Sequence, residues 1–202
     1  MKKVGLLGGT FNPPHIGHCI IANEVLHALN LDEVRLMPNA IAPHKKVLTG
    51  ATNEQRIEML KLAVSDVEKL RVEPFEVERG GISYSFETMR LLCEREPEVE
   101  FYFIIGGDSI DTLHTWYEID ELVKLVQFVG VNRPGFQSRS KYDVLMVEIP
   151  EINISSSLLR ERLAANESVH FLLPSKVESF IRKEGLYGTR AWDFTSGQGA
   201  SS

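Results

Sequence analysis

Between Gly5 and His18 the chain gathers glycines, a hydroxyl, two prolines and two histidines, in the order Gly-Leu-Leu-Gly-Gly-Thr-Phe-Asn-Pro-Pro-His-Ile-Gly-His. The segment overlaps the end of an apolar, strand-like run and leads into a helical pattern near Gly17. Glycines after a strand let backbone amides approach a ligand closely. The free N–H groups and the dipole at a helix start suit a phosphate, and the histidines add donors. We therefore predict a nucleotide-phosphate site here.

Two better-known phosphate-binding motifs do not fit this segment. The chain contains no Gly-x-x-x-x-Gly-Lys-Ser/Thr string, so it has no Walker P-loop. The dinucleotide fingerprint needs Gly-x-Gly-x-x-Gly running directly into a helix. Here the glycines fall at Gly5, Gly8 and Gly9, and Pro13-Pro14 delays the helix. The segment is therefore a different type of phosphate site.

His15 and His18 are three residues apart and have two other interpretations, a zinc pair or structural histidines. A zinc site needs a third and usually a fourth ligand, and no Cys/His pattern supplies them. Structural histidines stay an alternative, although the preceding glycines favour phosphate handling. We predict no metal site built from protein side chains.

A second segment, from Ile154 to Arg160, combines three serines with an arginine. Ser155 or Ser156 can cap the helix that follows, whose first amides would be free. Arg160 lies about one turn further on, close enough to share an anion with that helix start. Taken alone, the segment is also explained by a plain serine cap and a solvated arginine. Because the same chain also carries the glycine-rich segment, we favour a second anion-binding element here.

Strand-like and helical patterns alternate along the chain. The strands are expected at 4–7, 34–37, 70–75, 101–105, 128–131 and 144–149, and the helices near 17–29, 53–64, 85–95, 119–125, 156–165 and 174–184. Thr52 with Gln55 fits a capping box, Pro174 a first-turn position and Gly185 a helix stop. Such alternation predicts an α/β fold, a Rossmann-like doubly wound parallel sheet in a single domain. Ligands on that architecture bind at the carboxyl ends of the strands.

Composition narrows the class of protein. With 202 residues, 43% hydrophobic content and a net charge of −6, the chain reads as one globular domain without the basic face of a nucleic-acid binder. Cys19 and Cys93 form no redox or metal spacing, and no signal peptide or membrane-spanning run is visible, so we expect a cytoplasmic location. We assign residues 1–188 to the domain and 189–202 to a disordered tail or an expression remnant.

The two segments resemble motifs of the nucleotidyltransferase α/β-phosphodiesterase superfamily, Gly-Ser/Thr-Phe-Asp/Asn-Pro-x-His-x-Gly-His and Ile-Ser-Ser-Thr/Ser-x-x-Arg. Within it, the chain is similar to the bacterial nicotinate-nucleotide adenylyltransferases from Lys3 to about Tyr187. Further motifs of that subfamily follow in order: Pro43-His44-Lys45, 81–88, Gly106-Gly107-Asp108 and Trp116-Tyr117. The chain departs from these motifs at two positions, where Asn12 replaces the commoner Asp and Gly107 replaces a frequent Ala. Neither change removes a charged group that the implied chemistry needs.

The resemblance implies a role for each of these residues. The catalytic group is His18, His15 and Arg160. The ATP-binding group is Gly8, Gly9, Thr10, Phe11, Gly106, Asp108, Ser155 and Ser156. The mononucleotide-binding group is His44, Lys45, Tyr84, Ser85, Trp116 and Tyr117. Purely structural explanations stay open for three of these residues: an acidic helix cap for Asp108, a core position for Trp116 and a solvated side chain for Lys45.

The implied reaction joins ATP and nicotinate mononucleotide to give deamido-NAD and pyrophosphate, in NAD biosynthesis. The acceptor phosphate is already anionic, so no general base is needed, and Mg²⁺ is expected on the substrate phosphates rather than on protein ligands. We expect no nucleic-acid polymer or membrane partner, and a homodimer is left open. Two alternatives are another adenylyl- or cytidylyltransferase, such as one acting on phosphopantetheine, and a nucleotide sensor without turnover. The presence of Trp116 and of segment 81–88 argues against a different transferase. The presence of His18 and Arg160 argues against a sensor without turnover.

Overall fold

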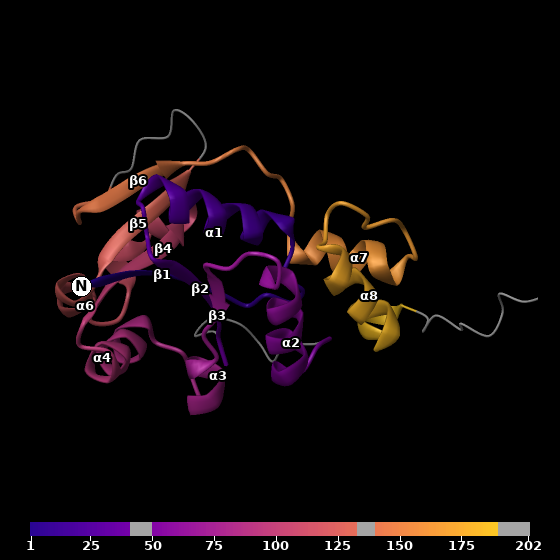
Figure 1. Ribbon diagram of the computed structural model, residues 1–202, viewed down its shortest axis with the longest axis horizontal. Helices are drawn as coiled ribbons and strands as arrows, with labels where there is room; N and C mark the ends of the chain where they lie inside the picture. The colour runs from indigo at the N-terminus through magenta and orange to yellow at the C-terminus, as the bar shows by residue number, and fades with distance from the viewer. Residues whose placement is uncertain (41–49, 133–139, 190–202) are drawn as a thin grey trace, which may run out of the picture.

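The computed structural model describes residues 1–40, 50–132 and 140–189. At its centre lies a parallel sheet of six strands in the order β3-β2-β1-β4-β5-β6 (Figure 1). The strands are β1 (Lys2–Gly9), β2 (Glu33–Pro38), β3 (Leu70–Val72), β4 (Val99–Gly106), β5 (Gln127–Asn132) and β6 (Val144–Glu148). The chain changes direction across the sheet between β1 and β4, so the carboxyl ends of these two strands flank the place where ligands bind in such folds.

Helices cover both faces of the sheet. One core contains side chains of α1 (Ile16–Ala28) and α2 (Asn53–Val64), and the other those of α4 (Ser85–Arg95), α5 (Gly107–Asp111), η1 (Leu113–Thr115) and α6 (Ile119–Leu125). Strand residues alternate between the two cores, as Phe103 and Ile104 of β4 show. Both faces of the sheet are therefore buried, as the predicted doubly wound class requires.

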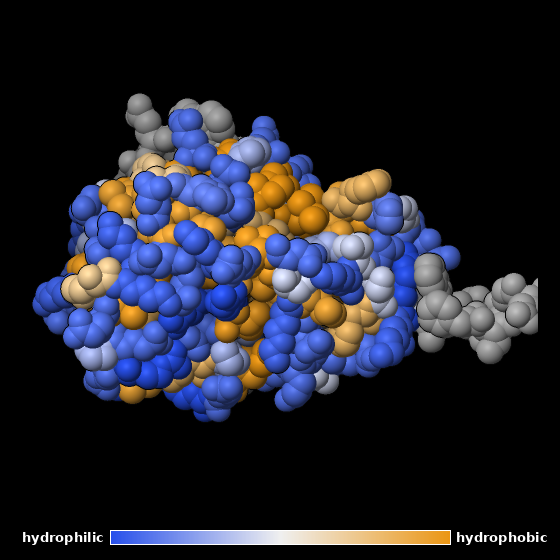
Figure 2. Space-filling view, viewed as in Figure 1, coloured by the Kyte–Doolittle hydropathy of each residue, from blue (hydrophilic) through white to orange (hydrophobic). Residues whose placement is uncertain are grey.

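A third group of apolar side chains lies on the side of α2 remote from the sheet. It joins Met59 of α2 to residues of α7 (Ser156–Ala164), α8 (Ser175–Lys183) and η2 (Leu186–Gly188). Figure 1 shows α7 and α8 beside α2, at the end of the molecule away from α4 and α6. This packing brings the serine-rich segment back toward the glycine-rich one. In Figure 2 the visible face is mostly hydrophilic, with apolar side chains gathered over α1.

Most predicted elements are present, and the differences have local causes. The strand expected over 70–75 ends at Val72, because Pro74 caps the unpredicted helix α3 (Phe75–Arg79). Pro174 is the N-cap of α8 rather than a residue of its first turn. Gly185 has φ 62°, so it stops α8 in the left-handed conformation that glycine favours. Thr52 and Gln55 form the expected capping box.

The last described residue packs against the domain. Thr189, which we assigned to the tail, is buried, and its hydroxyl donates to the backbone oxygens of Leu186 and Ile181 at 2.8 and 3.3 Å. The rest of the expected tail lies outside the described residues, as do residues 41–49 and 133–139. None of the described helices is long and apolar enough to cross a membrane.

Candidate active site

The predicted phosphate site lies at the carboxyl ends of β1 and β4. β1 ends at Gly9, directly before Thr10, and β4 ends at Gly106, directly before α5, whose second residue is Asp108. The two strands are hydrogen-bonded neighbours, with Leu7 opposite Ile104. The sequence-predicted glycine pairs are therefore adjacent at one edge of the sheet, on either side of the reversal in strand order.

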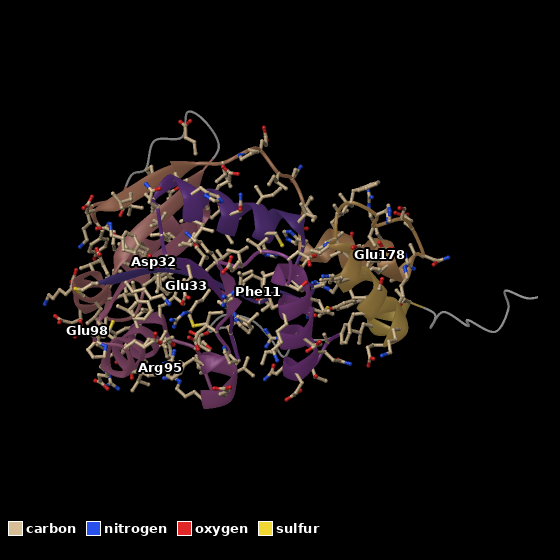
Figure 3. The ribbon with its side chains drawn as sticks, in the orientation of Figure 1. Phe11, Asp32, Glu33, Arg95, Glu98 and Glu178 are labelled. Atoms are coloured by element: carbon tan, nitrogen blue, oxygen red, sulfur yellow. The ribbon has the colours of Figure 1, made fainter. Side chains whose placement is uncertain are left out.

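Gly8 and Gly9 serve different purposes. A Cβ at Gly9 would lie 2.9 Å from the ring of Phe11, so this glycine makes room for that ring. Phe11 has φ 49° and is 1% exposed, and Figure 3 shows it in the middle of the molecule beside α2. Its side chain thus belongs to the core, which leaves only its backbone for the predicted contact with a ligand. A Cβ at Gly8 would meet only Phe103, at 4.0 Å, so protein packing does not require a glycine there.

This difference predicts opposite outcomes for two alanine substitutions. We expect Gly8→Ala to change the free energy of unfolding by less than about 0.5 kcal/mol. If Gly8 lines the predicted phosphate site, the added methyl group should raise KM for ATP about 10-fold. Gly9→Ala destabilises the fold by about 1–3 kcal/mol by overpacking against Phe11. Chemical denaturation and steady-state kinetics measure both. An unchanged KM in Gly8→Ala contradicts a close approach of substrate to Gly8.

The two histidines form a stacked pair at the start of α1. Their ring centroids are 3.7 Å apart, and the His18 ring also meets the edge of Phe11 at 4.8 Å. The backbone N–H of His15 donates to Nδ1 of His18 at 3.1 Å. Nδ1 of His18 is therefore the acceptor, and the proton of the neutral ring sits on Nε2, where it can be donated to a phosphate. Nδ1 of His15 is buried without a partner among the described residues.

Both rings are held neutral in the free protein. Burial lowers the pKa of His15 to about 4, and burial together with the charge of neighbouring His15 lowers the pKa of His18 to about 3. A bound triphosphate would act in the opposite direction, because a nearby anion favours the charged form of a histidine. The pair can therefore supply neutral N–H donors that are fixed in place before a ligand binds.

The lowered pKa values predict how stability depends on pH. A histidine binds its proton at pH 6.5 when unfolded but only near pH 3–4 when folded, so the unfolded state takes up more protons as the pH falls. Stability is full above pH 6.5 and decreases toward pH 4, by up to about 1.4 kcal/mol per pH unit for each histidine. Urea denaturation of wild type and His18→Gln between pH 7.5 and 4.5 measures this change of the unfolding free energy with pH.

The variant is needed because the buried carboxyl of Glu76 has a raised pKa and contributes with the opposite sign. That contribution is common to both proteins and cancels in their difference. We expect the decrease to be shallower in His18→Gln. Parallel curves would contradict a neutral, buried His18.

The serine-rich segment contacts the glycine-rich one directly. Ser155 is the N-cap of α7, accepting from the amide of Leu158 at 3.2 Å. Ser156 donates to the backbone oxygen of Pro13 at 2.8 Å, and Nη1 of Arg160 donates to that of Asn12 at 2.8 Å. The predicted juxtaposition of the two segments is confirmed. The structure adds that the guanidinium of Arg160 is itself held by protein atoms.

Asp108 is not the cap of its helix. Gly106 is the N-cap of α5, and Asp108 is the exposed second residue of that helix. The capping alternative is therefore wrong. An exposed carboxylate after the β4 strand end is left free to accept hydrogen bonds from ribose hydroxyls.

Four of the predicted mononucleotide residues are described. The Trp116 ring is half-buried and packs edge to face on Phe103 and Phe128 at 6.0 and 6.1 Å, so part of its surface belongs to the core. Tyr117 is 52% exposed and lies 5.2 Å from Tyr84, ring to ring. Tyr84 precedes Ser85, the first residue of α4, without a side-chain cap. His44 and Lys45 lie outside the described residues.

Sequence reasoning missed two residues behind the site. Arg56 in α2 is fully buried and donates to the backbone oxygens of Thr10 and Asn39. Tyr187 donates its hydroxyl to Oδ1 of Asn12 at 2.6 Å. An arginine on the buried side of an otherwise amphipathic helix was the available signal for Arg56. Tyr187 offered none, because its partner lies far away in the sequence.

Comparison of the chain with known proteins identifies its family. A family model described as cytidylyltransferase-like matches residues 6–162. A protein described as probable nicotinate-nucleotide adenylyltransferase from Bacillus licheniformis is 48% identical over 189 residues, which are 94% of this chain and 100% of the relative. The chain belongs to the nicotinate-nucleotide adenylyltransferase family. Another member so described, from Bacillus anthracis, is 49% identical over 93% of this chain and 99% of its own length.

Solved structures of nicotinic acid mononucleotide adenylyltransferases share the fold. The Plasmodium falciparum protein complexed with NaAD aligns with a TM-score of 0.77 at 19% identity, covering 93% of this chain and 98% of that one. The same protein complexed with APC aligns with a TM-score of 0.76 at 20% identity and the same coverage. The six-stranded doubly wound sheet is thus the sheet of this adenylyltransferase family.

Proposed function

We propose that the protein transfers the adenylyl group of ATP to nicotinate mononucleotide, forming deamido-NAD and pyrophosphate in NAD biosynthesis. The observation that carries the proposal is the contact between the two anion-binding segments. Arg160 and Ser156 at the start of α7 hydrogen-bond the backbone of Asn12 and Pro13, beside His18. Donors from α1, α7 and the β1 end therefore converge on one place, which suits a polyphosphate.

The chemistry needs positioning and charge neutralisation. An oxygen of the mononucleotide 5′-phosphate attacks the α-phosphorus of ATP, forming one P–O bond. The bond from the α-phosphorus to the bridging oxygen breaks, and its electron pair leaves with pyrophosphate. The nucleophile is already anionic, so no side chain has to remove a proton. His18 Nε2–H would donate to the α-phosphate, while His15, Thr10, Arg160 and the amides near Ser156 hold the other phosphates.

A magnesium ion would be held by the substrates in this proposal. The described residues include no cluster of three or more histidine, cysteine or acidic side chains that could bind a metal ion. Phosphate oxygens and water satisfy the octahedral preference of Mg²⁺ without such a cluster. When bound, the ion would neutralise phosphate charge, as the guanidinium of Arg160 would.

The acceptor would bind between β4 and α4. Trp116 and Tyr117 follow η1, and Tyr84 with the uncapped start of α4 lies against Tyr117. Exposed ring surface suits a pyridine ring, and free amides at a helix start suit its carboxylate. Asp108 would bind ribose hydroxyls of ATP. The proposal does not depend on whether the protein forms a homodimer.

Pyrophosphate release across a panel of acceptors tests the proposal. ATP is combined in turn with nicotinate mononucleotide, nicotinamide mononucleotide and phosphopantetheine, and also incubated alone. We expect the highest kcat/KM with nicotinate mononucleotide and no release without an acceptor. A preference for phosphopantetheine, or ATP binding without turnover on any acceptor, would refute it.

A further inference from the structure

Arg56 is a buried cation that the roles above do not use. Its side chain is fully buried, at 0% exposure. Its guanidinium donates to Thr10 O at 2.7 Å, Asn39 O at 2.6 Å and Asn53 Oδ1 at 2.7 Å. No carboxylate of the described residues forms an ion pair with it, and its Nε has no partner among them. Burying a charge without a counter-ion is costly, so this arrangement calls for an explanation.

The acceptors show what the guanidinium holds. Thr10 follows β1 and Asn39 follows β2, and the two segments are also joined by the amide of Asn39, which donates to Gly9 O at 3.0 Å. Arg56 therefore ties together the carboxyl ends of two neighbouring strands. The planar fork of arginine suits this task, because it can donate to separate acceptors in fixed directions.

The bond to Thr10 also orients the next residue. In a trans peptide the C=O and the following N–H point in opposite directions. With the carbonyl of Thr10 turned toward buried Arg56, the amide of Phe11 points away from it. Phe11 has φ 49°, an uncommon conformation for a bulky residue that persists where surrounding contacts enforce it. The Phe11 ring in turn packs on His18 at 4.8 Å.

We propose that Arg56 is a positioning residue for adenylyl transfer, which fixes the Thr10–Phe11 peptide and, through the Phe11 ring, the orientation of His18. The inference rests on the proposed function. Arg56 touches no substrate itself, since it is wholly buried. Its charge, which three amide oxygens solvate and no described carboxylate pairs with directly, adds a positive potential behind the phosphate site, which solvent screens less than it would a surface charge.

The test compares two conservative variants, Arg56→Lys and Arg35→Lys. Lysine keeps the charge but cannot bridge Thr10 and Asn39 as a fork. Arg35 is a matched control, because it is also shielded from solvent and donates to Glu33, Glu73 and Glu96 away from the histidines. We expect Arg56→Lys to lower kcat by about 10- to 100-fold, with a smaller change in KM. Arg35→Lys should lower the melting temperature without changing kcat.

The outcomes are distinct. The proposal is overturned if Arg56→Lys folds and keeps the wild-type kcat. It is also overturned if Arg35→Lys loses as much kcat as Arg56→Lys when both variants lose the same melting temperature. If Arg56→Lys does not fold, Asn53→Ala removes one acceptor and should lower kcat about 3-fold; an unchanged kcat there also overturns it. If wild type forms no dinucleotide, the proposed function fails instead. Arg56→Lys must then weaken binding of a non-hydrolysable ATP analogue, measured by calorimetry, for the positioning role to survive.

Discussion

Replacing His18 by alanine lowers kcat about 10²–10³-fold, the scale for losing one preorganised donor to developing charge. The hydrogen bond from the His15 amide to Nδ1 leaves Nε2–H as the only donor of the neutral ring. Burial holds the ring neutral in the free protein, with its pKa lowered to about 3. The donation is therefore fixed in direction before ATP binds, and its loss falls mainly on the transition state rather than on substrate affinity.

A control for this substitution lies in the same helix. His27 is exposed near the end of α1, so His27→Ala should keep kcat within about 2-fold, as surface changes usually do. Single-turnover measurements with saturating ATP separate the chemical step from product release. If His18→Ala keeps a near-normal rate in that step, the imidazole does not act on the reacting phosphate.

Arg160→Ala raises KM for ATP by about 10- to 100-fold, the scale for removing a charged hydrogen-bond donor. The guanidinium donates to Asn12 O and to Ser157 Oγ at 3.1 Å, which leaves further N–H groups for a phosphate beside the start of α7. Its loss removes a phosphate partner and also loosens the Asn12 backbone. KM for the mononucleotide should change less than about 3-fold, because that substrate is expected at β4 and α4.

Separate titrations of the two substrates check this difference. Arg162 is the matched control, since it lies in the same helix and is partly exposed. Among the described residues it donates to Ser168 O and approaches Glu167. Arg162→Ala should leave both KM values unchanged. An equal effect of Arg160→Ala on the two substrates would show that the arginine is not a triphosphate ligand.

The site could be predicted from the sequence where its residues are consecutive. The segments 5–18 and 154–160 each place their residues through one strand end or one helix start, and doubly wound topology brings strand ends to one edge. That reasoning correctly joined two segments whose hydrogen-bonded residues, Asn12 and Arg160, are far apart in the chain. It also led to the correct order of the six strands and the six longer helices, while the short elements α3, α5, η1 and η2 were not among the expected ones.

The remainder depends on tertiary contacts that no local pattern records. Phe11 reads as a loop residue, yet its ring fills space that Gly9 leaves open. The sequence suggests an aromatic residue in a loop at Trp116, yet its ring packs edge to face on Phe103 and Phe128. Arg56 and Tyr187 act on backbone or side-chain atoms of Thr10 and Asn12 from other helices. Such contacts follow from the packing of α2 and η2, which only the folded structure shows.

The central claim is direct transfer between two bound substrates, and isotope exchange tests it most directly. Radiolabelled pyrophosphate is incubated with protein, ATP and Mg²⁺, and label entering ATP is measured with and without nicotinate mononucleotide. The account predicts no exchange without the mononucleotide and rapid exchange with it, because pyrophosphate can reverse only a reaction that has formed the dinucleotide. Exchange in the absence of mononucleotide, which would require an adenylylated protein, or no exchange in its presence, would contradict the account.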